Sequence, residues 1–150
     1  MTFITIRKPV RIREAPIDSE YGLHKWTVQQ LRSFARPDVR FWHTANEGKV
    51  SNASIGKRGA MGVSAGIPDL EIWINGDCHF LELKWGKNDL SIEQREFFAW
   101  AQNHRIPCEV ARTQDQVMSI LEEWNAVRPS GWQFRGHGGV KPSPVHGGAE

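Results

Sequence analysis

The chain is poor in cysteine and has no long apolar run. Two cysteines, Cys78 and Cys108, stand among its 150 residues, and two thiols do not make the disulfide framework of a small secreted domain. No segment approaches the roughly 20 apolar residues that a membrane-spanning helix needs. The N-terminal residues, MTFITIRKPVRIRE, lack the apolar core and cleavage site of a signal peptide. We therefore expect a cytoplasmic protein with free thiols and no membrane partner.

A large excess of one charge is also missing, because the formal net charge is only +2. The cations are nevertheless concentrated between His24 and Arg58, where only Asp38 and Glu47 oppose them. The seven cations of this basic block are Lys25, Arg32, Arg36, Arg40, Lys49, Lys57 and Arg58. Such a block suits a polyanion such as DNA or RNA. A solvated surface has the same composition, so charge alone leaves both interpretations open.

Hydrophobic spacing in the first half of the chain predicts a strand over residues 3–7, a helix over 18–35 and a strand over 39–45. Asp18 or Ser19 can cap the helix, and Pro37 prevents its continuation. Residues 46–66 hold five glycines and predict a long loop, of a kind that is often functional. The residues of the helix expected to face the core are Leu23, Trp26, Thr27, Leu31 and Phe34.

The second half predicts a β-hairpin followed by helix, strand and helix. Strands over residues 70–74 and 79–84 flank Asn75-Gly76-Asp77, whose asparagine and glycine accept the positive φ of a tight turn. Capping boxes, Ser91-x-x-Gln94 and Thr113-x-x-Gln116, open helices over about 92–104 and from 113 onward, with a strand over 108–111 between them. The core positions expected in these two helices are Trp100, Val117, Ile120, Leu121 and Trp124.

This order of elements predicts the α/β class, with a small mixed central sheet flanked by helices. The length fits one domain, which we place at residues 1–126. Residues 127–150 are rich in glycine, proline and histidine and have no hydrophobic period. We expect them to form a flexible tail.

The hairpin carries residues that suit phosphodiester chemistry. Asp69 comes just before the first strand, and Glu82 and Lys84 lie two apart on the second, so both of these side chains project from one face. Carboxylates placed together repel each other unless a cation compensates them. A surface hairpin with an ordinary ion pair would also contain Glu-x-Lys, but the added Pro68-Asp69 at this spacing makes the pattern more specific.

A divalent metal would compensate the carboxylates. Mg²⁺, or Mn²⁺ in its place, prefers hard oxygen ligands, which Asp69, Glu82 and the backbone carbonyl of Leu83 would supply. The metal would lower the pKa of the attacking water and spread the charge that develops on the phosphate. Lys84 would orient that water, help to deprotonate it, or stabilise the transition state.

These motifs resemble the PD-(D/E)xK nuclease superfamily, and most closely its VRR-NUC group of small, often phage-encoded nucleases. The resemblance implies a restriction-endonuclease-like core and a Mg²⁺-dependent deoxyribonuclease that acts on branched DNA such as Holliday junctions or flaps. Stand-alone members are thought to act as dimers, which implies a homodimer here, in a bacterium or a phage-infected cell. The resemblance runs from about Ser19 to Trp124, on Glu20, His43, Asn46, Gly62, Gly66-Ile67-Pro68-Asp69-Leu70, Glu82-Leu83-Lys84 and Gln94.

Two further polar residues have a structural alternative. The resemblance implies that Glu20 is a metal ligand, directly or through water, but a first-turn acid is also favoured by the helix dipole. The resemblance likewise turns Gln94 into the site, whereas a capping box accounts for Gln94 without catalysis. We expect the site role for both residues, and we expect that one Gln94 side chain cannot fill both roles at once.

The candidate substrate-binding residues lie in or beside the basic loop. His43 and Asn46 flank it and could contact phosphate, although a structural histidine is an equal alternative. Lys49, Lys57 and Arg58, with the amides of the neighbouring glycines, would approach the DNA backbone.

The function favoured by these residues is a structure-selective, metal-dependent endonuclease that hydrolyses phosphodiester bonds. A restriction-type, sequence-specific endonuclease is less favoured, because base readout needs more surface than this loop offers. A catalytically inactive nucleic-acid-binding module with the nuclease fold is a second alternative, and an interaction protein with a charged hairpin is a third. The intact Asp69, Glu82 and Lys84 argue against the inactive module. An interaction protein would leave the basic loop and the Gly66-x-Pro68-Asp69 turn without a reason to occur together.

Overall fold

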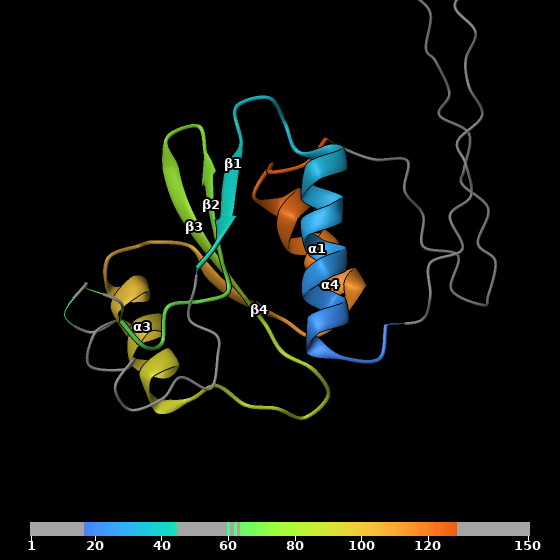
Figure 1. The fold of residues 1–150 in the computed structure, drawn as a ribbon. Helices are drawn as coiled ribbons and strands as arrows, with labels where there is room; N and C mark the ends of the chain where they lie inside the picture. Colours follow the sequence, from blue (N-terminus) through green and yellow to red (C-terminus); the bar gives the residue numbers. More distant parts are fainter. Residues whose placement is uncertain (1–16, 45–59, 61, 63, 129–150) are drawn as a thin grey trace, which may run out of the picture.

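The computed structural model describes residues 17–44, 60, 62 and 64–128 (Figure 1). The predictions for residues 3–7, for most of the loop over 46–66 and for the tail from 129 lie outside the described residues. In the described part the order is α1 (Glu20–Phe34), β1 (Arg40–His43), β2 (Leu70–Ile74), β3 (Asp77–Leu83), α3 (Ile92–Asn103), β4 (Cys108–Ala111) and α4 (Gln114–Glu123). This confirms the predicted order of elements and the α/β class.

The sheet is mixed, with strand order β1-β2-β3-β4. The β1–β2 and β2–β3 pairs are antiparallel, and the β3–β4 pair is parallel. The hairpin closes through Asn75 (φ 50°) and Gly76 (φ 88°), because a two-residue turn of this kind needs positive φ at both positions. Asp77 already pairs with Ile74, so β3 begins two residues earlier than predicted.

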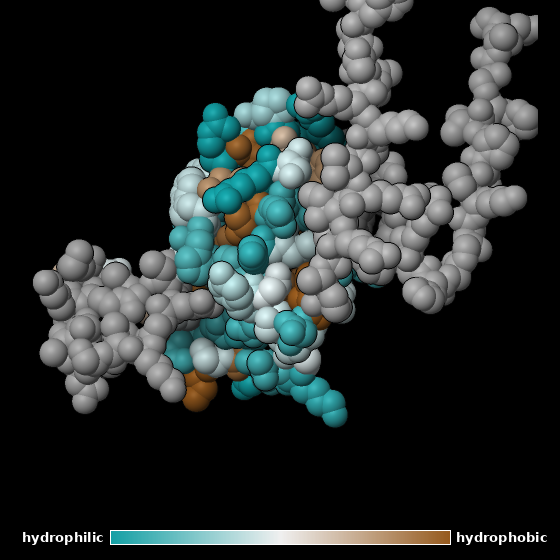
Figure 2. Space-filling view, turned by 45° about the vertical axis from the view of Figure 1, so that its right-hand side comes forward, coloured by the Kyte–Doolittle hydropathy of each residue, from teal (hydrophilic) through white to brown (hydrophobic). Residues whose placement is uncertain are grey.

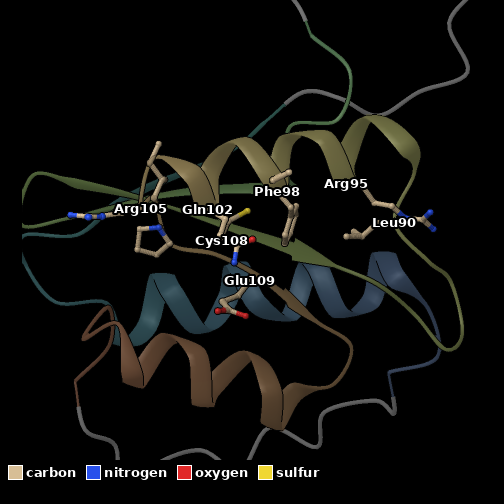
Figure 3. A pocket seen from close by; sticks show the side chains of 10 residues that line it. Leu90, Arg95, Phe98, Gln102, Arg105, Cys108 and Glu109 are labelled. Atoms are coloured by element: carbon tan, nitrogen blue, oxygen red, sulfur yellow. The ribbon is translucent and has the colours of Figure 1, made fainter.

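Two helices cover one face of the sheet and one covers the other. Figures 1 and 3 show α1 and α4 together on one side and α3 on the opposite side. The main core lies between the sheet and the α1–α4 pair. Its fully buried side chains include Leu23, Leu31, Leu70, Ile72, Leu81, Leu83, Val117 and Leu121, each 0% exposed.

The apolar stripe predicted for the first helix is confirmed. Leu23, Trp26, Thr27 and Leu31 are buried, and Phe34 packs against the core. The helix begins where its cap predicts, because Ser19 Oγ accepts a hydrogen bond from Gly22 N–H at 3.1 Å and satisfies one of the free donors of the first turn.

Three sequence predictions about packing were wrong in detail. Trp100 is 47% exposed rather than in the core, because it lies on α3, a helix of which only Ala101 is buried. Val127 is buried and pairs with Ala35, so the packed chain continues past residue 126. The second capping box is only half formed, since Gln116 Oε1 accepts from the N–H of Arg112 rather than of Thr113.

The visible surface is mainly polar. Hydrophilic residues predominate over the described part of the face in Figure 2, with hydrophobic side chains showing between them. In the ranges that the structure describes, no helix has both the length and the apolar character to cross a membrane.

Candidate active site

The two predicted carboxylates meet at one end of the sheet. Asp69 directly precedes β2, and Glu82 lies near the end of β3, which pairs with β2. The N–H of Asp69 donates to Glu82 Oε2 at 3.1 Å, and the N–H of Leu83 donates to Asp69 Oδ2 at 2.8 Å. The carboxylates of Asp69 and Glu82 therefore share one side of the sheet, as the hairpin pattern predicts.

Glu82 is the centre of the cluster. It is only 1% exposed, and its Oε1 receives both Lys84 Nζ at 2.8 Å and Gln94 Nε2 at 2.5 Å. A buried carboxylate is costly unless its oxygens are bonded. Both oxygens of Glu82 have partners, supplied by three different parts of the chain.

The electrostatics reflect this crowding. Burial, followed by the charge of Asp69, raises the pKa of Glu82, while Lys84 and the Asp69 N–H partly oppose the rise. Burial alone would lower the pKa of Lys84, but its bond to Glu82 and the charges of Glu82, Glu20 and Asp69 outweigh burial and raise it. Lys84 is therefore held as an ammonium, and the two carboxylates remain in mutual repulsion.

Gln94 fills both of the roles that the sequence analysis treated as exclusive. Its Oε1 accepts from the N–H of Ser91 at 2.9 Å, and its Nε2 donates to Glu82 Oε1. The expectation that one side chain could not do both was wrong, because an amide carries an acceptor at one end and donors at the other. The same glutamine caps α3 and ties the start of that helix to the site.

Glu20 lies near the cluster, and its charge acts on Lys84. It lines a pocket of about 360 Å³ together with Tyr21, His24 and His43. His43 Nδ1 donates to the backbone carbonyl of Asp69 at 2.9 Å, which leaves its Nε2 as the other ring nitrogen to face a ligand. Glu20 and His43 thus border the site from the side of α1.

His24 is a neighbour that the sequence analysis did not single out. Its ring meets the ring of His43 edge-on, with centroids 4.7 Å apart. The available signal was the spacing, because His24 follows Glu20 by four residues and so shares its face of the helix.

Gly66 explains how α3 approaches the cluster. Its φ is +85°, and a Cβ at this position would lie 2.5 Å from the backbone of Glu93 in the first turn of α3. Only glycine allows both the left-handed conformation and this close approach. The segment before Asp69 therefore packs directly on the helix that carries Gln94.

The site offers oxygen ligands to a metal. Among the described residues, no three His, Cys, Asp or Glu side chains form a metal-binding group. Asp69 and Glu82 supply two carboxylates, however, and the carbonyl of Leu83 faces the same edge of β3 as its N–H, which bonds Asp69. Burial, followed by the charge of Asp69, raises the pKa of Glu82, and this set of hard oxygens fits a Mg²⁺ ion that keeps several waters.

The carboxylates are buried, but the space next to them is accessible. Beside them lies a pocket of about 380 Å³ that Gly66, Ile67, Lys84 and Gln94 help to line. A larger pocket of about 660 Å³ lies elsewhere, between α3 and β4, with Phe98, Gln102 and Cys108 on its walls (Figure 3). That pocket contains none of the candidate catalytic residues.

The other predicted substrate-binding residues, Asn46, Lys49, Lys57 and Arg58, lie outside the described residues. Searches against family models, curated proteins and solved structures find no match to this chain. Its function is therefore inferred from the chemistry of the site.

Proposed function

We propose that this protein is a Mg²⁺-dependent DNA endonuclease of the VRR-NUC group, with the restriction-endonuclease-like core of the PD-(D/E)xK superfamily. One observation carries the proposal: the buried carboxylate of Glu82 binds Lys84 and Gln94 and lies beside Asp69. A structural ion pair needs only one acid and one base. The second acid adds repulsion that Lys84 does not fully offset, since the pKa of Glu82 stays raised, first by burial and then by the charge of Asp69, and a bound divalent cation would relieve it.

Each side chain then has a separate task. Asp69, Glu82 and the Leu83 carbonyl would hold the metal, and Glu20 would contribute directly or through water. When bound, Mg²⁺ lowers the pKa of the attacking water and offsets the charge that develops on the phosphate. Lys84, held as an ammonium, positions that water and stabilises the transition state as a point charge. Gln94 keeps Glu82 and Lys84 aligned.

The surroundings suit a polymeric substrate. The cluster lies at the end of the sheet. One pocket is lined by its members Lys84 and Gln94, and a second is lined by Glu20, whose charge acts on Lys84, and by His43. Helix N-termini attract phosphate through their free N–H groups. We propose branched DNA as the substrate and a homodimer as the active form, because two strands must be cut at a junction.

The test is cleavage of plasmid, linear, single-stranded and four-way-junction DNA in Mg²⁺, Mn²⁺ or EDTA. We expect metal-dependent cutting, with preference for branched over linear duplex DNA, and a loss of roughly a hundredfold or more in Lys84→Ala. Lys87→Ala is the matched control, because Lys87 is an exposed lysine three residues further along, and it should cut normally.

The alternatives give different results in the same assay. Binding of DNA by both the unchanged protein and Lys84→Ala, without cutting by either, would identify an inactive binding module. Discrete fragments from linear DNA would identify a sequence-specific enzyme. Absence of both binding and cutting would reject the nuclease assignment. Sedimentation of the unchanged protein tests the dimer.

A further inference from the structure

Two exposed tryptophans lie side by side on the sheet. Trp42 on β1 is 47% exposed, and Trp73 on β2 is 37% exposed. Both indole N–H groups donate to the same carboxylate, Trp42 to Glu71 Oε2 at 3.1 Å and Trp73 to Glu71 Oε1 at 2.7 Å. One carboxylate therefore fixes the two rings by their edges. Trp42, Glu71 and Trp73 belong neither to the hydrophobic core nor to the candidate active site.

The tryptophans share a face of the sheet with the candidate active site. Side chains alternate along a strand, so Asp69, Glu71 and Trp73 of β2 project to one side. Trp42 pairs with Glu71 across the β1–β2 ladder and projects to that side too. The register places Trp42 about two residues along the sheet from Asp69, or about 7 Å at the usual rise per residue.

Helix α3 covers only the other half of this face. It lies over β3, where Phe97 meets Phe80 with ring centroids 4.9 Å apart, and it contacts β4. Over β1 and β2, in the part of the chain that the structure describes, the two indoles stay exposed. Among the described residues, the two indoles therefore lie on the same sheet face as the carboxylates, in the half that α3 does not cover.

We propose that Trp42 and Trp73 form a stacking platform for the bases of an unpaired DNA strand that continues from the cleaved phosphate. This inference rests on the proposed nuclease function and names its substrate class, DNA with a single-stranded arm. Bases stack on aromatic rings whatever their sequence, because every base has a π-face. A platform of this kind selects strand state rather than sequence.

The chemistry of the platform favours bases over another protein surface. Its rings lie on the same sheet face as the site that would hold the phosphate. Arg40, exposed at the register position opposite Trp73, adds a positive charge beside them, although its Nη1 donates to the carbonyls of Pro37 and Val39. Glu71 is the positioning residue: its carboxylate also accepts from Cys78 Sγ at 3.8 Å, so three donors hold it in place. Its charge is directed to the ring edges and leaves the ring faces to stack.

The test measures binding of labelled oligothymidylate and of a matched duplex to the full chain in EDTA, where no cleavage occurs. We expect Trp42→Leu/Trp73→Leu to bind oligothymidylate at least tenfold more weakly and the duplex unchanged. Trp42→Phe/Trp73→Phe, which keeps two rings, should recover most of the affinity. Trp100→Leu is the matched control, because Trp100 is also 47% exposed but lies on α3, and it should bind normally.

Three results would overturn the platform. The first is an affinity of the leucine variant for oligothymidylate that equals that of the unchanged protein. The second is a loss of affinity for the duplex as large as the loss for oligothymidylate. The third is a change of the leucine variant from dimer to monomer in sedimentation with binding per protomer intact, which would make this face a contact between copies. If the leucine variant unfolds, the phenylalanine variant is compared with Glu71→Ala, in which both indoles lose their hydrogen-bond acceptor. The platform then requires that the phenylalanine variant has the higher affinity for oligothymidylate.

The platform and the nuclease can fail separately. A protein that cuts DNA while all tryptophan variants bind oligothymidylate equally retains the nuclease and loses the platform. A protein that never cuts but shows the ring-dependent binding retains the platform and loses the nuclease.

Discussion

Gln94 connects the stability of a helix with the geometry of the site through one side chain. Its carbonyl oxygen caps α3, and its amide nitrogen holds Glu82. Ser91 takes part only in the cap, where its hydroxyl accepts from Gln94 N–H at 3.1 Å. The two residues therefore allow the two effects to be measured apart.

We predict that Ser91→Ala and Gln94→Ala each lower the free energy of unfolding by about 1 kcal/mol, since each removes a capping bond. Only Gln94→Ala should also lower cleavage, by about tenfold or more, because Glu82 and Lys84 lose their alignment. Urea unfolding and initial cleavage rates of both variants provide the measurement. Equal cleavage by the two variants would show that Gln94 is only a cap.

The two thiols are both free, as expected from the sequence. Burial, followed by the charge of Glu71 and a hydrogen bond to it, raises the pKa of Cys78 to about 11. Burial is also the first cause at Cys108, where neighbouring negative charges add to it and raise the pKa to about 12. Since the thiolate is the nucleophile, both groups are inert near neutral pH.

At pH 8 we predict that both thiols of the folded protein react with a disulfide reagent at least about a hundredfold more slowly than in urea. The raised thiol pKa values should also make the free energy of unfolding depend on pH. The folded pKa values exceed the ordinary 9.0, so their contribution is complete below about pH 9 and is lost as the pH rises through 11 to 12. Cys78→Ala and Cys108→Ala assign each effect, and rapid modification of a native thiol would contradict the burial.

At the scale of elements, the position of α3 depends on one close backbone approach. Gly66 and Gly62 both have positive φ, but only Gly66 has a neighbour, the Glu93 backbone, where a Cβ would go. Alanine at Gly62 therefore measures the cost of the left-handed conformation alone, and alanine at Gly66 measures that cost together with the steric clash.

We predict that Gly62→Ala costs roughly 1 kcal/mol of stability, from the left-handed conformation alone. Gly66→Ala should cost about 1–3 kcal/mol more and should lower cleavage, because α3 and Gln94 move away from Glu82. Denaturant unfolding and cleavage assays compare the two. Equal costs would mean that the segment before Asp69 yields without moving the helix.

At the scale of the whole molecule, metal binding should appear as stability. A ligand held only by the folded chain raises the free energy of unfolding by about 2.7 kcal/mol at a hundred times its Kd. We predict a rise in Tm with Mg²⁺ that Asp69→Asn abolishes. Glu71→Gln is the control, since it removes a carboxylate from the same face but outside the site, and it should keep the shift.

The rise in Tm that Mg²⁺ causes should become larger as the pH rises. The pKa of Glu82 is raised, so a proton competes with the metal until the pH exceeds that value. Without metal the sign is opposite: the stability from protonated Glu82 is full below about pH 4.5 and is lost as the pH rises through the raised pKa. Melting curves from pH 5 to 8 measure both trends, and a Mg²⁺ shift independent of pH would contradict metal binding at Glu82.

Much of the fold was readable from local patterns. Ser19, Ser91 and Thr113 marked the helix starts, and Asn75-Gly76 marked the hairpin. Each of these signals is a hydrogen bond or a φ preference within a few residues. Trp100 was misplaced because helical spacing says which residues share a face, but it does not say how much of that face another layer covers.

In the candidate site, too, some features follow from local sequence patterns and others depend on packing. The spacing of Asp69, Glu82 and Lys84 could be predicted to bring them together, because a hairpin has a fixed period and register. The place of His24 beside His43, the fit of Gly66 on α3 and the pairing of two indoles on Glu71 could not, since each joins segments whose relative position depends on packing.

By itself, the sequence determined the elements, the hairpin and the gathering of two acids and a lysine on one strand pair, because these follow from interactions between near neighbours in the chain. Only the tertiary structure decided that α3 comes close enough for Gln94 to serve both the cap and the carboxylate of Glu82, and that α3 leaves the tryptophans of β1 and β2 exposed within the described part of the chain. Those outcomes depend on how layers pack, and packing is set by contacts between residues far apart in the sequence.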